Sequence, residues 1–106
     1  MSELNEKQME TLLSECRAYL GITWTDTQTD EQLKMFIKTS AKRIEAIFGD
    51  DLDFTEGEEA YEHLAHELLL TRVFYLREKG IDDFEGNFRG ELLTLRNYGL
   101  IKRSEL

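Results

Sequence analysis

EEAYEHLAHELLLTRVFYLREK, from Glu58 to Lys79, is the stretch of sequence that decides the fold. Thr55 precedes it with the T-x-x-E spacing of a capping box, and Gly80 follows it where a helix can end in a left-handed residue. Its first half is amphipathic, and residues 68–76 are apolar on almost every side. Because a helix that is apolar all round must be covered all round, we expect this to be the central helix of the protein.

Three further apolar patterns with helical spacing surround this stretch. The first begins after Asn5, with Gln8 completing a capping box, and the second begins at Thr29. The expected helices cover about residues 5–20, 29–48, 57–79 and 88–98, and each is followed by a glycine. Residues 81–86 are expected to form a turn, and residues 99–106 a C-terminal tail.

The composition agrees with an all-α fold. The 106 residues include no proline, and a third of them are charged, which favours helices over a sandwich that needs many turns. The length suits one domain with a modest core. We therefore expect a single small bundle of about four helices around a long central third helix, with residues 1–106 forming one domain.

The charge is distributed unevenly. Of the 22 acidic residues, 12 lie between positions 50 and 85, against 3 of the 13 basic ones, and the net charge is −9. Nucleic-acid binding needs clustered Lys and Arg that displace counterions from phosphates. The balance therefore argues against a protein that wraps nucleic acid, and no stretch is long and apolar enough to span a membrane.

His63 and His66, one turn apart between two glutamates, are the first candidates for a metal site. Their H-x-x-H-E order matches neither zinc-protease motif. The alternative, which we favour, is that Glu62–His66 and His63–Glu67 are pairs that support the helix. Residues 51–62 also approach a calcium loop, but Gly57 stands at position seven where such a loop needs glycine at six.

Two isolated residues complete the candidates for chemistry or contact. Cys16 lies on the apolar face of the first helix, so a buried, inert thiol is expected, and as the sole cysteine it cannot form an internal disulfide. Trp24 lies in a polar connection, where packing onto the bundle is favoured over presentation to a partner. No catalytic, cofactor or metal site is predicted, because no groups with convergent roles are visible.

The order of the patterns resembles tailed-phage head–tail connector proteins, also called adaptor or head-completion proteins. The similarity covers roughly residues 16–98. The segments that carry it are YLGIT (Tyr19–Thr23), TDEQL (Thr29–Leu33), the helix from Leu33 to Gly49, VFYLRE (Val73–Glu78) and GELLTLRNY (Gly90–Tyr98).

This resemblance implies a non-enzymatic subunit of the virion, made in the host cytoplasm. About a dozen copies would form a ring beneath the portal protein and contact a tail-side stopper or head-completion protein. DNA would pass through the ring without sequence-specific binding. By the same analogy, Tyr98, Leu100, Ile101, Lys102 and Arg103 are candidate portal contacts, and Asp50, Asp51, Asp53 and Glu56 form a candidate acidic loop at the channel or outer surface.

A second function class stays open at this point. A small acidic helical module that regulates or binds one partner protein would have the same composition. Such a module predicts a compact monomer or dimer whose binding weakens with salt.

Overall fold

The computed structural model describes residues 4–24 and 26–104, which form five α-helices and no strand. These are α1 (Glu6–Leu20), α2 (Thr27–Phe48), α3 (Ala60–Arg77), α4 (Ile81–Asn87) and α5 (Arg89–Ser104). The all-α class is therefore confirmed. The C-terminal Glu105 and Leu106 of the expected tail lie outside the described residues.

Side chains at the helix starts explain where the helices begin. Asn5 and Gln8 form the expected capping box: the Gln8 amide donates to Asn5 Oδ1 at 2.8 Å, and the Asn5 amide donates to Gln8 Oε1 at 3.0 Å. The second helix begins two residues before the prediction because Asp26 caps it, accepting from the Gln28 amide at 3.3 Å and from Thr29 Oγ1 at 2.8 Å.

The ends of α3 also differ from the prediction. The capping box of Thr55 and Glu58 is wrong, since the helix begins at Ala60 and the Glu59 amide donates to Glu62 Oε1 at 3.4 Å. At the other end the left-handed residue is Lys79, with φ 60°, and not Gly80. The Gly80 amide donates to the carbonyl of Tyr75 at 2.8 Å, a bond of the type that closes helix ends.

The C-terminal quarter of the chain is more helical than expected. Residues 81–86, predicted to be a turn, belong to α4, and α5 continues through Gly99 to Ser104. The prediction of a helix end at Gly99 and of a tail after it is therefore wrong for the described residues. The glycine has another role: a Cβ atom at Gly99 would lie 1.9 Å from the carbonyl oxygen of Phe48, so only glycine allows α5 to approach the end of α2 this closely.

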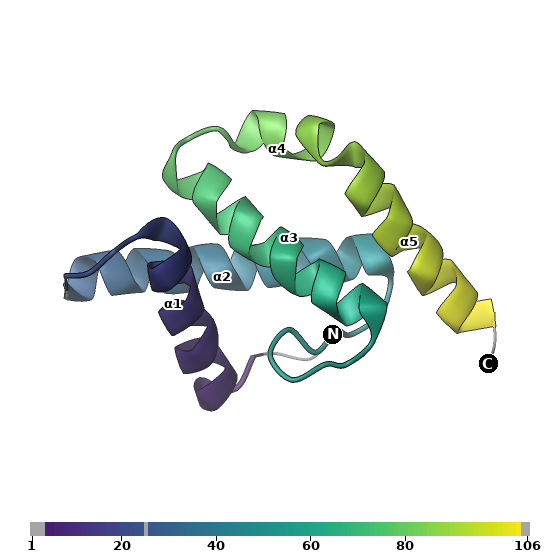
Figure 1. Ribbon diagram of the computed structural model, residues 1–106, viewed down its shortest axis with the longest axis horizontal. Helices are drawn as coiled ribbons and strands as arrows, with labels where there is room; N and C mark the ends of the chain where they lie inside the picture. Colours follow the sequence, from purple (N-terminus) through teal and green to yellow (C-terminus); the bar gives the residue numbers. More distant parts are fainter. Residues whose placement is uncertain (1–3, 25, 105–106) are drawn as a thin grey trace.

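Figure 1 shows α3 lying across α2, with α1 beside one end of the pair and α5 beside the other. The longest helix is α2, and α3 is the helix that packs against all four others. The molecule is flat, with extents of 45 × 30 × 19 Å. Its core draws residues from every helix, including Leu12, Leu33, Ile44, Leu69 and Leu95, each 0% exposed.

The connection between α2 and α3 is also tied to the core. Leu52 and Phe54 are buried, while the acidic residues between and after them lie at the surface or half-buried. The side chains of Leu52 and Phe54 belong to the core and hold the acidic loop against the bundle.

α3 is less completely covered by the other helices than its sequence predicts. Its apolar second half is not covered on every side, because Phe74 is 40% exposed and Leu70 is only partly buried. The ring of Tyr19, at the end of α1, packs edge to face against Phe74, with 6.4 Å between the ring centroids. Tyr19 is itself 51% exposed. The five helices therefore leave an apolar patch on the outer face of α3.

Candidate functional site

The candidate portal contacts divide into two groups on α5. Three of them contact other parts of the same subunit while staying partly exposed. Arg103 Nη1 donates to the carbonyl of Phe48 at 2.6 Å, Lys102 forms an ion pair with Asp50 at 3.3 Å, and the ring centroids of Tyr98 and Tyr61 lie 6.0 Å apart. The other two, Leu100 and Ile101, are about half exposed. The outward apolar surface at this end of the helix is thus provided by those two side chains.

The acidic loop is ordered by its own carboxylates. Asp53 Oδ1 accepts from the amides of Thr55 and Glu56 at 3.0 and 2.9 Å, and these two bonds lower the pKa of that carboxyl. The pKa of Asp50 is also lowered, first by the amide of Asp51 and then by Lys102. Asp51 and Glu56 are exposed. The four candidate acids therefore lie in one loop, and the carboxylates of Asp50 and Asp53 accept hydrogen bonds from its backbone.

The same contacts weaken the calcium interpretation of this loop. Glu62 Oε2 accepts from the Asp53 amide at 3.2 Å, so the carboxylate expected at position twelve already serves the loop backbone. A Cβ atom on Gly57 would lie 2.7 Å from the carbonyl oxygen of Asp53, which explains the glycine by packing and not by a metal-loop turn.

A groove with a basic edge runs between α2 and α5. It has a volume of about 500 Å³, and its lining includes Arg89, Leu93, Arg96 and Leu100 from α5. On the α2 side of the groove, Arg43 makes a bidentate ion pair with Glu85 of α4, with both nitrogen–oxygen distances 2.8 Å. The sequence reading missed this face, although arginines and leucines repeating every seven residues along α5 are visible in the sequence.

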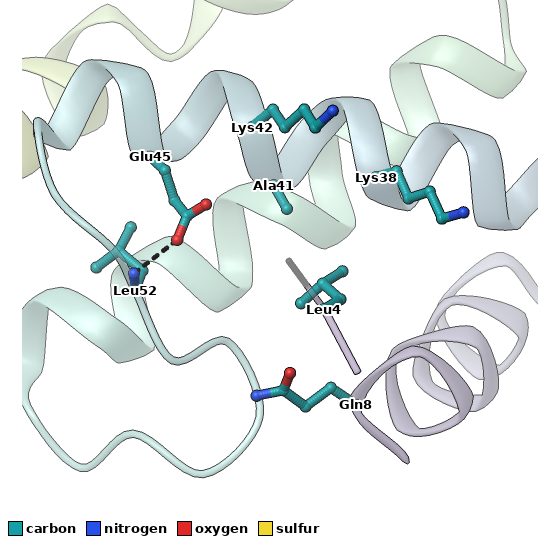
Figure 2. Close-up of a pocket in the computed structure, with 7 residues that line it drawn as sticks. All are labelled: Leu4, Gln8, Lys38, Ala41, Lys42, Glu45 and Leu52. Atoms are coloured by element: carbon teal, nitrogen blue, oxygen red, sulfur yellow. Dashed lines mark hydrogen bonds between the residues drawn. The ribbon is translucent and has the colours of Figure 1, made fainter. Parts of the chain in front are cut away.

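A second cavity, of about 280 Å³, contains a buried carboxylate (Figure 2). Glu45 on α2 is 3% exposed, and its Oε2 accepts from the Leu52 amide at 2.8 Å. Burial raises the pKa of this carboxyl, and the hydrogen bond from Leu52 opposes the rise in part. Figure 2 shows Lys38 and Lys42 on the same helix with their side chains extending away from the Glu45 carboxylate. Glu45 thus holds the start of the acidic loop against α2.

The histidines of α3 are separated by their contacts. His66 Nε2 lies 3.1 Å from Glu15 Oε1 of α1, and Glu62 binds backbone amides, so the predicted Glu62–His66 pair is wrong. Within residues 4–24 and 26–104, no three His, Cys, Asp or Glu side chains lie together as metal ligands would. His66 therefore links α3 to α1.

Cys16 is buried as predicted, whereas Trp24 is more exposed than predicted. Cys16 is 0% exposed, and burial raises the pKa of its thiol to about 12, as expected for an inert residue. Trp24 is 51% exposed, so the favoured packing onto the bundle is wrong for half of its surface. Its backbone carbonyl accepts from Arg17 Nη2, and Arg17 also pairs with Asp30 at 2.5 Å, which fixes the connection between α1 and α2.

Comparisons of the chain with protein-family models, with curated proteins and with solved structures give no match. Across the described part of the chain, no helix has the length and apolar character that crossing a membrane requires. The structure leaves two groups of apolar side chains exposed. One group lies on α3 near acidic residues, and the other lies on α5 among arginines.

Proposed function

We propose that this protein is a non-enzymatic head–tail connector subunit of a tailed phage. About a dozen copies would assemble into a ring beneath the portal and continue the DNA channel toward the tail. We regard α3, which contacts every other helix, as the centre of a small bundle that forms the body of each subunit.

The observation that carries the proposal is the pair of uncovered apolar surfaces on a subunit with a small core. Phe74 and Tyr19 form one, and Leu93 and Leu100 of α5 belong to the other; all four side chains are between 40% and 51% exposed. Surfaces of this kind mark contacts with other proteins. When two different patches of one chain meet in neighbouring copies, and the rotation closes, the product is a ring.

The segments of the resemblance support the same proposal by their structural roles. Gly21 and Gly49 occupy the left-handed ends of α1 and α2, with φ of 72° and 94°. Ile22, Ala41 and Ile44 are buried. The similar positions are therefore those that determine the helix lengths and the packing of a subunit.

In this proposal the end of α5 meets the portal. Ile101 would make the contact, while Lys102 and Arg103 hold the helix end in place through Asp50 and Phe48. The surplus of acidic side chains, repeated around a ring, would keep the assembly from adhering to DNA phosphates as the duplex passes.

A binding experiment with the portal protein of the same genome tests the proposal. Ile101→Asp places a charge in the contact, and Met35→Asp is its control, because Met35 is an exposed apolar residue of α2. We expect the wild type and the Met35 variant to sediment with portal rings, and Ile101→Asp to bind at least about tenfold more weakly, as loss of an apolar anchor produces. Failure of the wild-type protein to bind portal rings would overturn the connector assignment.

The acidic composition supports a second candidate, a small regulatory or protein-binding module. Glu56, Glu58 and Glu59 are exposed just before α3, and this module would bind a basic partner through them. Its binding would fall steeply with salt, whereas an apolar portal contact would change little. Mass spectrometry of purified particles separates the two, since only a connector is a stoichiometric part of the neck.

A further inference from the structure

The outer face of α3 carries an acidic apolar stripe. Glu67, Leu70 and Phe74 follow one another at intervals of three and four residues, so they share one side of the helix. Glu67 and Phe74 are exposed, and Leu70 is partly buried. On α1, Tyr19 extends the apolar part of this acidic stripe through its edge contact with Phe74.

The matching face of α5 is a basic apolar stripe. Arg89, Leu93, Arg96 and Leu100 are spaced four, three and four residues apart, and all four line the groove beside α2. Leu93 and Leu100 are 47% and 49% exposed. Whereas Arg43 and Arg103 have partners at 2.8 and 2.6 Å, Arg89 and Arg96 make no hydrogen bond or ion pair with any residue that the structure describes.

The two stripes complement each other but lie on different helices. On α3 the exposed acid Glu67 precedes the apolar pair, and the half-buried Arg77 follows Phe74, whereas on α5 exposed arginines and leucines alternate. The spacing of both stripes is that of helices packed side by side. In Figure 1, α3 crosses the middle of the molecule while α5 forms one edge of it. A contact between them in two copies is thus head-to-tail, with each copy using both stripes.

We propose that the basic apolar stripe of one copy packs against the acidic apolar stripe of the next, and that this contact links the subunits. The inference rests on the proposed ring and deepens it by naming the two surfaces that meet. Opposite charges across the contact set the pairing and disfavour α5-to-α5 and α3-to-α3 contacts, in which like charges would face each other.

Charge reversal of one residue in each stripe tests the contact in the full-length protein. Arg96→Glu and Glu67→Arg each place like charges across it, and we expect each to raise the concentration needed for self-association at least about tenfold, as like-charge juxtaposition does. The double variant restores opposite charges, and it should associate as the wild type does. Neither residue belongs to the candidate portal contacts.

Lys7→Glu and Glu10→Arg are the matched controls, because they make the same charge changes at exposed positions of α1. Sedimentation velocity up to ~1 mM protein measures the association, and circular dichroism checks that each variant is folded. Recovery in the double variant but not in either single one supports the contact.

Three results would overturn the inference: a wild type that stays monomeric over this range, single variants that associate as the wild type does, or a double variant that does not recover. The connector assignment has a separate test, which is the portal binding of the Ile101 and Met35 variants. Conversely, a chain that self-associates through these stripes but never binds portal rings would keep this contact and lose the connector function.

Discussion

Arg103 donates a hydrogen bond to the carbonyl oxygen of Phe48 at 2.6 Å, which joins the last turn of α5 to the last residue of α2. The final carbonyls of a helix have no partner within the helix itself. An arginine from 55 positions further along the chain provides one here. The contact anchors the C-terminal helix that the proposed portal contact depends on.

Gly99 makes this junction sterically possible, so its replacement should be costly. Gly99→Ala would bring a Cβ atom to 1.9 Å from the Phe48 oxygen. We expect a loss of about 1–3 kcal/mol in the free energy of unfolding, the range for overpacking a tight site, despite the better helix propensity of alanine. Urea unfolding followed by circular dichroism measures it.

Gly90 of the same helix is the control, because a Cβ atom there would have no neighbour within 4 Å. Gly90→Ala should raise the free energy of unfolding by up to about 1 kcal/mol, since alanine is the better helix former. Equal effects of the two substitutions would contradict the close approach of α5 to α2.

Removal of the Arg103 guanidinium should weaken the same junction. Arg103→Met keeps much of the side-chain length but leaves the Phe48 carbonyl without its donor. We expect a loss of about 1–2 kcal/mol, at the lower end of the range for a hydrogen bond to a charged group because Arg103 is exposed. Thermal unfolding of dilute protein measures it. Arg89→Met should change the stability by less than about 0.5 kcal/mol, because Arg89 is exposed and has no bonding partner in the described chain. A loss of the same size at both positions would show that the contact with Phe48 contributes nothing.

Glu45 should make stability fall as the pH rises. Its pKa is raised above the ordinary value of about 4.3 by burial, so the folded state holds a proton that the unfolded state has lost. The free energy of unfolding therefore decreases as the pH increases from about 4.3 to the raised pKa of Glu45, and stays lower above it.

Glu45→Gln removes this titration while keeping an oxygen that can accept from the Leu52 amide. We expect the difference in stability between variant and wild type to shift in favour of the variant across that pH range. Glu45→Ala should instead lose about 1–3 kcal/mol at every pH, because the buried Leu52 amide is left without an acceptor. Chemical unfolding between pH 4 and pH 7, both values chosen to bracket an ordinary glutamate pKa of about 4.3, measures both. A pH-independent difference for Glu45→Gln would refute the raised pKa.

The ion pair of Arg43 and Glu85 connects α4 to α2. Both side chains are nearly half exposed, so their coupling should be less than about 1 kcal/mol despite the two-pronged geometry. Arg43 lowers the pKa of Glu85, which makes this stabilisation present above the ordinary glutamate pKa and lost as the pH falls through the lowered value.

A double-mutant cycle with Arg43→Met and Glu85→Gln measures the coupling. It should decrease in 1 M salt, where the screening length is only about 3 Å. A coupling that is unchanged by salt and by acid would show that the two side chains interact by packing and not by charge.

Local signals in the sequence were sufficient for the helical class and for much of the first three helices. Apolar spacing and capping residues depend on neighbours within four positions, so Asn5 with Gln8, and the glycines after α1 and α2, were predictable. The same rules failed where a distant partner intervened. Gly99 was interpreted as a helix end because glycine usually serves that role, yet here it fits the carbonyl of Phe48.

The sequence predicts which residues belong to the candidate site but not the contacts that they make. The sequence indicated the acidic loop and the apolar residues at the C-terminus, but Lys102 and Arg103 pair with Asp50 and Phe48, about 50 residues earlier in the chain. Such pairings depend on how α5 lies against α2, and no local pattern encodes that.

The sequence by itself determined that this protein is helical, acidic through its middle third and apolar along each helix, because composition and periodicity are properties of the chain. Only the tertiary structure decided which apolar side chains are covered. Phe74 and Leu69 look alike in the sequence of α3, but one is 40% exposed and the other 0%. Five helices of this size cannot cover all of one another's surfaces, and their packing determines which surfaces stay exposed.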